Sequence, residues 1–453
     1  MKVENGNKKI IEYKKIIKEQ KKKIKLEKKE IRRQRREKYR KSKFGKTIIG
    51  RFFGVIFFIF RDKDNYSFSE MFVTTIASLL LGFFACFSIL TVFSGGRNYF
   101  KMVHDLGKFY DVYNTLISNY NGELSHDKLI DEAIVGMVSS VGDVYTSYND
   151  SKTTEDFDQL VSGTYEGIGC TIQKVETGIK VVQVYENTPA SKAGLKENDI
   201  IKTVDNIKAL EVSVDKLSDY IKNDAKGKIN IVVLREDKEL TFVLERAKVE
   251  IPSIVTKTFE KNGKKIGYIG ISIFSSVTAK QFEDKLVKLE KDNISALVID
   301  VRDNNGGYLS SVSDVASILL PKGEVIYQVQ SGKKTEVTKD KTSTKRDYPI
   351  AVLTNANSAS ASEILAAVIK ESYGGYVVGT KTYGKGTVQQ VKRLDDGSMI
   401  KYTTQNWLTP NGNWINNVGI EPTHKIELNQ EFYKKPSDDV DNQLQKALEL
   451  VSE

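Results

Sequence analysis

An uncharged apolar segment divides this chain and limits what it can fold into. Residues Met71 to Gly96 carry no charged side chain, and the stretch from Met71 to Phe93 reads MFVTTIASLLLGFFACFSILTVF. A helix that crosses a bilayer needs roughly 20 predominantly apolar residues, and this segment is longer. We therefore predict one transmembrane helix at residues 71–96, with separate regions on either side of it.

The distribution of charge predicts the orientation of that helix. The 453-residue chain has a net charge of +10, yet residues 1–46 hold 21 Lys and Arg against 6 Asp and Glu. This arm therefore carries +15 and the remainder −5. Basic segments stay on the cytoplasmic side of a membrane. We expect a single-pass protein of the cell membrane, with a basic cytoplasmic arm at residues 1–46 and an extracytoplasmic catalytic part.

A cleaved signal peptide is the alternative interpretation of the apolar segment. A second apolar run, Phe52–Phe60, is too short to cross a bilayer, and we expect it to lie in the headgroup interface. The long basic region and this second run fit a retained anchor better than a cleaved leader.

The basic arm has a seven-residue repeat of isoleucine at Ile10, Ile17, Ile24 and Ile31. This spacing is typical of a coiled-coil seam, but the second seam position is mostly polar. A cationic helix held near anionic lipid is an equal alternative. Nucleic-acid binding is the weaker one, because no aromatic-rich or glycine-rich pattern is interleaved with the basic residues for base contact, and we predict no nucleic-acid partner.

The pattern of predicted helices and strands after the apolar segment indicates the domains of the chain. Residues 101–155 have apolar positions at helical spacing, which we interpret as a packing bundle or a homodimer interface. Short strands and turns fill residues 158–250. Strands alternate with helices over residues 251–430, which predicts an α/β domain with a mixed sheet, and residues 431–453 form a helical tail.

Metal and cofactor chemistry finds no support in the sequence. The histidines are His104, His126 and His424, without ligand spacing, and neither a CxxC nor an HExxH motif occurs. Cys86 lies in the apolar segment and Cys170 in the strand-rich region, so no disulfide is expected. We predict no metal site and no cofactor.

The stretch NSASASEIL, Asn357 to Leu365, places alternate serines ahead of an apolar helix. Ser360 and Glu363 have the spacing of a capping box, which alone explains Ser360. A catalytic serine needs a base, and no histidine is next to a glycine-rich loop. A lysine kept neutral by burial is the other solution. Lys385, between two glycines in GTKTYGKGTVQQ, is the candidate, and Lys381 is its rival.

Several segments together resemble the motifs of carboxyl-terminal processing proteases, also called tail-specific proteases. The resemblance covers about residues 101–430. It rests on segments in that family's order: AIVGMVSSVGDVYTSYND, the PDZ-like YEGIGCTI and PASKAGLKENDII, DVRDNNGG, NSASASEI, YGKGTVQQ and VGIEP.

The resemblance assigns roles to individual residues. Ser360 matches the nucleophile, Lys385 the general base, and Gln389 the glutamine that helps to position the lysine. The backbone N–H groups of Gly307 and Ala361 match the oxyanion hole. The family pattern before the glycines is closer to N-N-P-G-G, and the proline is absent here.

The same resemblance implies the fold and the function. The fold is an α/β protease core with a mixed, ClpP/crotonase-like sheet, an inserted or preceding PDZ-like β-rich domain, and the N-terminal helical region. The peptide-binding loop of the PDZ-like domain consists of Gly167, Ile168, Gly169 and Cys170. We expect a membrane-anchored serine endopeptidase that cleaves exported proteins near accessible C-termini. A non-catalytic, membrane-tethered PDZ scaffold is the alternative.

Overall fold

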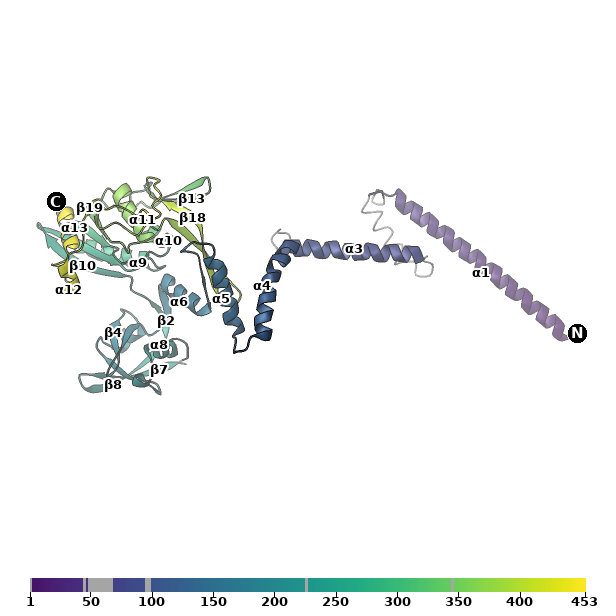
Figure 1. Ribbon diagram of the computed structural model, residues 1–453, viewed down its shortest axis with the longest axis horizontal. Coiled ribbons are helices and arrows are strands. Elements are labelled where there is room, and N and C mark those ends of the chain that lie inside the picture. The colour runs from purple at the N-terminus through teal and green to yellow at the C-terminus, as the bar shows by residue number, and fades with distance from the viewer. Residues whose placement is uncertain (1, 44–45, 48–67, 94–98, 225–226, 344–345) are drawn as a thin grey trace. The chain divides into compact units, whose positions relative to one another are not determined.

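The computed structural model of the chain describes residues 2–43, 46–47, 68–93, 99–224, 227–343 and 346–453 (Figure 1). These residues form two units, Met1–Leu124 and Ser125–Glu453, each of which is described by itself.

The first unit is helical. Its described helices are α1 (Lys2–Lys41), α3 (Phe68–Phe93) and α4 (Tyr99–Asn119). Within the described part of the chain, no helix has both the length and the apolar character that crossing a membrane requires. The predicted transmembrane helix at residues 71–96 is therefore not confirmed. The predicted interfacial segment Phe52–Phe60 and residues 94–96 lie outside the described residues.

The second unit is built on a central mixed sheet with the order β10-β11-β12-β15-β16-β19. β10 and β11 are antiparallel, and the remaining neighbours are parallel, as predicted for an α/β core. The strands are β10 (Ile254–Lys261), β11 (Lys264–Ile271), β12 (Ala296–Asp300), β15 (Ile350–Thr354), β16 (Tyr376–Gly379) and β19 (His424–Lys425).

Helices cover both faces of this sheet, which is why its central strands read as continuous apolar runs. In β12, Leu297 and Ile299 pack with the helices α9 and α10 and with α11, whereas Ala296 and Val298 pack with the C-terminal helix α13. The helices are α9 (Thr278–Lys291), α10 (Leu309–Leu319), α11 (Ala361–Val368) and α13 (Asn442–Ser452); a π-turn, η3 (Ile369–Tyr373), extends α11, and a short α12 (Gln430–Lys434) precedes α13. The predicted helical tail is thus one wall of the core.

A second sheet joins the helical region to the protease core. Its order is β1-β18-β13-β14, with β17 also paired to β18. The elements are α5 (His126–Ser139), β1 (Ser147–Asn149), α6 (Ser151–Ser162), β13 (Val325–Ser331), β14 (Lys334–Lys339), β17 (Thr387–Arg393) and β18 (Met399–Leu408). Because β1 pairs with β18, a short piece of the predicted helical region is a strand of the catalytic unit.

The PDZ-like domain is inserted between these elements. Its first strand β2 (Thr164–Gly167) pairs with β9 (Ala247–Glu250), so the chain enters and leaves the domain through one two-stranded stem. The domain sheet has the order β3-β4-β5-β7-β8 with β6 on β5. Its elements are β3 (Cys170–Val175), β4 (Gly178–Val184), α7 (Pro189–Ala193), β5 (Ile200–Val204), β6 (Ile207–Lys208), η1 (Ala209–Glu211), α8 (Val214–Asp219), η2 (Tyr220–Asp224), β7 (Lys228–Arg235) and β8 (Lys238–Glu245).

Candidate active site

Ser360 lies at the turn between β15 and α11, at the carboxyl end of a central parallel strand. Its φ is +56°, which non-glycine residues rarely adopt and which the surrounding structure must hold in place. Its N–H donates to the Glu363 carboxylate at 2.8 Å, so the predicted capping box is present. Beyond it, the N–H groups of Ser362 and Glu363 donate to the carbonyls of Ala359 and Ser360, whereas that of Ala361 is not a donor among the described backbone hydrogen bonds.

The two flanking serines have structural roles. The hydroxyl of Ser358 donates to the Val301 carbonyl at 2.7 Å, and that of Ser362 donates to the Asn304 carbonyl at 2.8 Å. Both side chains are fully buried. They tie the serine turn to the loop after β12, and Ser360 is the partly buried serine between them.

Glu363 connects the serine turn to the lysine loop. One oxygen of its fully buried carboxylate, Oε2, accepts hydrogen bonds from the N–H groups of Ser360 at 2.8 Å and Lys385 at 2.9 Å. The other oxygen accepts from the Thr382 hydroxyl and the Gly384 N–H, both at 2.6 Å. The backbones of Ser360 and Lys385 are therefore held by a single atom. Sequence reasoning found Glu363 only as a helix cap.

Lys385 has the surroundings of a lysine base. Burial lowers the pKa of its amino group below the ordinary value, and repulsion by Lys401 acts in the same direction. Attraction by Glu363 and Asp143 opposes this shift without reversing it. The rival Lys381 is about half exposed and forms an ion pair with Glu421 at 3.1 Å. The structure therefore favours Lys385 of the two candidates.

A segment of the helical region completes the environment of Lys385. The Nζ atom of Lys385 lies 4.8 Å from the centroid of the Tyr145 ring. Beside it, the Asp143 carboxylate accepts hydrogen bonds from the Tyr145 N–H at 3.1 Å and the Thr146 hydroxyl at 2.6 Å. Sequence reasoning assigned no site residue here, because nothing in the spacing connects residue 145 with residue 385.

Gln389 is placed on β17, four residues after Lys385. Its amide donates to the hydroxyls of Thr387 at 2.9 Å and Thr403 at 3.2 Å. The hydrogen bonds of the described residues do not join Gln389 to Lys385, and its role in positioning the lysine stays a prediction.

The glycine loop after β12 approaches the serine turn closely. A Cβ atom added to Gly306 would lie 2.9 Å from the Ser360 Cβ and 3.1 Å from the Ala361 nitrogen. Gly307 has a φ of +146° and packs so closely on Phe274 that an added Cβ would lie 2.2 Å from its carbonyl oxygen. Among the described backbone hydrogen bonds, neither the Gly307 nor the Ala361 N–H is a donor. Both predicted oxyanion-hole groups are thus available to bind an oxygen.

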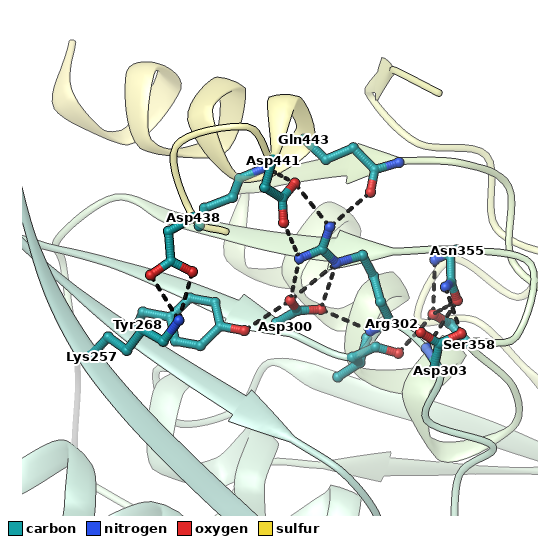
Figure 2. Close-up of polar contacts among 12 residues, drawn as sticks. Lys257, Tyr268, Asp300, Arg302, Asp303, Asn355, Ser358, Asp438, Asp441 and Gln443 are labelled. Atoms are coloured by element: carbon teal, nitrogen blue, oxygen red, sulfur yellow. Dashed lines mark hydrogen bonds and ion pairs between the residues drawn. The ribbon is translucent and has the colours of Figure 1, made fainter. Parts of the chain in front are cut away.

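An ion-pair cluster anchors the start of the same loop (Figure 2). Arg302, with 13 % of its side chain exposed, binds Asp300 and Asp441, each at 2.7 Å. Its guanidinium also donates to the Gln443 amide oxygen at 3.0 Å. The C-terminal helix is therefore bound to the strand end that leads into the glycine loop. A cavity of about 920 Å³ opens beside Arg302, but neither Ser360 nor Lys385 is among the described residues that line it.

The predicted peptide-binding loop lies between β2 and β3 at the edge of the PDZ-like sheet. The carbonyls of Ile168 and Gly169 accept backbone hydrogen bonds from inside the domain, at 2.8 and 2.9 Å. The ring of Tyr165 packs on Gly167, and its hydroxyl interacts with the N–H groups of Gly169 and Cys170. A phenol oxygen therefore lies where the carboxylate of a bound peptide is expected.

Three segments match known protein families. Residues 265–426 match peptidase family S41, residues 166–245 match the PDZ domain, and residues 91–153 match the N-terminal domain of the activating protease CtpB.

Two relatives agree with these matches. The chain is 36 % identical over 335 residues to the carboxy-terminal processing protease CtpB of Bacillus subtilis (strain 168), covering 73 % of this chain and 70 % of that protein. A probable CtpA-like serine protease of Staphylococcus aureus (strain N315) is 33 % identical over 326 residues, covering 71 % of this chain and 65 % of that one. The solved photosystem II D1 C-terminal processing protease is 25 % identical, with a TM-score of 0.42, over 73 % of this chain and 87 % of that one.

Proposed function

Because the chain belongs to peptidase family S41, as a serine-type carboxyl-terminal processing peptidase with a PDZ domain, we propose that it cleaves with a dyad of Ser360 and Lys385. The observation that carries this proposal is the Glu363 carboxylate, which binds the backbone N–H of both residues through one oxygen. The buried position of Lys385 supplies the second requirement, because a lysine acts as a base only in its neutral form.

The reaction follows from these positions. The Nζ lone pair of Lys385 takes the Ser360 hydroxyl proton as Oγ attacks the scissile carbonyl carbon. The carbonyl π electrons move onto oxygen, and the N–H groups of Gly307 and Ala361 stabilise this oxyanion together with the N-terminus of α11. The ammonium of Lys385 then returns the proton to the amide nitrogen as the oxyanion re-forms the carbonyl and the C–N bond breaks. Lys385 next takes a proton from water as it attacks the acyl-enzyme, and returns that proton to Ser360 Oγ as the ester bond breaks.

Removal of each dyad member tests the mechanism. The full chain in detergent is incubated with a denatured substrate that carries a label upstream of a free C-terminus. We expect Ser360→Ala and Lys385→Ala to reduce cleavage to background, whereas Lys381→Ala retains it, because that lysine is paired with Glu421 on the surface. Equal cleavage by the wild type and the first two variants would refute the dyad, whereas absence of cleavage in all of them would leave the non-catalytic PDZ scaffold as the better interpretation.

The PDZ-like domain is proposed to capture the C-terminal tail of the substrate. β3 is an edge strand of the domain sheet, so an extended peptide can add to it. The loop at residues 167–170 offers backbone N–H groups at the end of that strand, and Tyr165 has to leave them when a carboxylate binds. The test is binding of one peptide with a free or an amidated C-terminus to the inactive Ser360→Ala chain. Equal affinities for the two peptides would contradict carboxylate capture.

The proposal includes a membrane anchor and export of the catalytic unit. Its support is the uncharged sequence of residues 71–96, the basic arm before it, and apolar side chains that α3 leaves exposed, among them Leu79 at 68 % and Phe84 at 62 %. Carbonate extraction should leave the full chain in the membrane pellet and release a chain that lacks residues 68–96. Protease added to intact cells should digest the catalytic unit. Release of the full chain by carbonate would remove the anchor from the proposal.

A homodimer through the helical region is the last part of the proposal. On and just after α5, Met137 and Val141 expose 64 % and 65 % of their surface, so both side chains are accessible to a second copy of the chain. Sedimentation velocity of the full chain in detergent should give the mass of two chains, and that of Met137→Lys the mass of one. A wild-type monomer would contradict the dimer.

A further inference from the structure

We propose that Tyr145 is a positioning residue for Lys385: the face of its ring holds the lysine amino group in place and keeps water away from it. The inference rests on the proposed Ser/Lys mechanism and extends it to a segment outside the protease core. The central observation is the distance of 4.8 Å between the Nζ atom and the ring centroid.

The position of Tyr145 is determined by strand pairing. Residues Ser147 to Asn149 form β1, which pairs with β18 so that Ser147 lies opposite Lys401. In addition, the Thr403 N–H donates to the Thr146 hydroxyl at 3.2 Å. β18 also pairs with β17, the strand that begins two residues after Lys385. Tyr145 and Lys385 are therefore attached to two strands that flank the same central strand.

The charges around Lys385 show what the ring adds. Asp143 and Glu363 attract the ammonium form, and Lys401 repels it. A neutral amine must nevertheless be present before the reaction, and an aromatic ring that covers Nζ favours it by excluding water. Once the Ser360 Oγ–H bond breaks and the proton binds to Nζ, an ammonium forms against the ring face. A cation within about 6 Å of a ring centroid is attracted by the aromatic quadrupole.

The ring, rather than the hydroxyl, carries this role. The Tyr145 hydroxyl is hydrogen-bonded to Tyr383, and burial together with that bond raises its pKa to about 12. It therefore stays protonated at neutral pH and does not exchange protons with the substrate. A phenylalanine at position 145 should consequently preserve the function.

The experiment compares kcat/KM against pH for variants of the full chain. Tyr145→Phe should match the wild type. Tyr145→Ala should lose about tenfold in kcat/KM at neutral pH, the scale of one aromatic contact with an ammonium. Its activity should recover only in part at alkaline pH. Water reaching Nζ raises the pKa of Lys385 and so moves the acid limb, the fall of activity toward low pH, to higher pH, while the missing ring face lowers the plateau as well. The loss should appear in kcat more than in KM.

Two further variants separate positioning from damage to the fold. Tyr145→Leu covers Nζ without a ring face, so its acid limb should stay closer to that of the wild type while kcat at the plateau is lower. Tyr148→Ala disturbs the same strand, where the Tyr148 hydroxyl binds Asp131 at 2.6 Å, and should leave the acid limb unchanged.

Two results would overturn the proposal: an unshifted acid limb in both Tyr145→Ala and Tyr145→Leu with wild-type kcat, or an equal loss in Tyr145→Phe and Tyr145→Ala. Either result would leave the dyad standing as long as Ser360→Ala and Lys385→Ala are inactive. Activity in those two variants would instead refute the proposed function itself.

Discussion

Replacement of Glu363 by glutamine or alanine should separate its structural and electrostatic effects. The carboxylate accepts four hydrogen bonds, two on each oxygen. A glutamine has one acceptor oxygen, and its NH₂ group then faces the other pair of donors. The NH₂ group costs less stability if it faces Thr382 and Gly384 than if it faces Ser360 and Lys385, because the threonine hydroxyl can rotate while a backbone N–H cannot. Glu363→Gln therefore leaves one buried N–H without an acceptor, and Glu363→Ala leaves three.

The magnitudes follow from the cost of an unsatisfied buried group, about 1–3 kcal/mol each. Glu363→Gln should lower the free energy of unfolding by about 1–3 kcal/mol and keep the Ser360 and Lys385 N–H groups bound to the remaining oxygen. Glu363→Ala should lose about 3–9 kcal/mol, a large part of the roughly 5–15 kcal/mol that stabilises a typical domain, and should be inactive.

Two pH effects accompany the glutamine variant. The Glu363 charge raises the pKa of Lys385, so its removal should lower that pKa and move the acid limb of kcat/KM to lower pH. Burial also raises the pKa of Glu363 itself, so the folded state binds its proton more tightly than the unfolded state does. Wild-type stability should therefore fall as pH rises from the ordinary carboxyl pKa through the raised one, and Glu363→Gln should lack this slope.

The assays are urea unfolding at several pH values and kcat/KM against pH on a labelled peptide. If Glu363→Ala were as stable and as active as the wild type, Glu363 could not be the link between the serine turn and the lysine loop. A shift of the glutamine variant's acid limb to higher pH would refute the electrostatic part alone.

Other substitutions test the surrounding scaffold. Arg302→Met leaves the Asp441 carboxylate buried without its partner and should cost about 3–5 kcal/mol in urea unfolding, with near-wild-type stability counting against the cluster. Gly307→Ala brings a Cβ within 2.2 Å of a backbone oxygen and should abolish cleavage. The control Gly263→Ala, at a positive φ but in open space, should only lower the melting temperature slightly. Similar activity in both variants would contradict the close approach of the glycine loop. Ser358→Ala removes a buried hydrogen bond and should lower the free energy of unfolding by about 1–3 kcal/mol while cleavage continues, and a complete loss of cleavage in a folded variant would argue for a catalytic role.

Much of the site was predictable because its signals are local in the sequence. The S-x-x-E spacing placed Ser360 at the start of a helix, and α11 begins at Ala361. The alternation of strands and helices after residue 251 predicted the mixed sheet, because apolar periodicity depends on neighbouring residues. The choice of Lys385 over Lys381 came from motif resemblance; in the structure Lys385 is the more buried of the two, and its role as base is a proposal.

Other parts depend on contacts that no local pattern encodes. The paired strands β2 and β9 make the PDZ-like domain an insertion, where the sequence allowed either an inserted or a preceding domain. The sequence predicted only a helical tail at the C-terminus, because an amphipathic pattern does not show which surface the helix packs against. In the structure it packs against one face of the central sheet. The Gln389 amide donates to threonines on its own strand and on the adjacent strand, and no short sequence pattern specifies these partners.

The sequence by itself determined the order of the segments, the serine turn and the class of chemistry, since these follow from residue types and short-range spacing. Only the tertiary structure decided what surrounds Lys385. Glu363 holds its backbone, Tyr145 covers its amino group, and Lys401 repels its charge. The pKa of a lysine depends on burial and on charges within a few ångströms, and strand pairing between segments far apart in the chain is what brings those groups together.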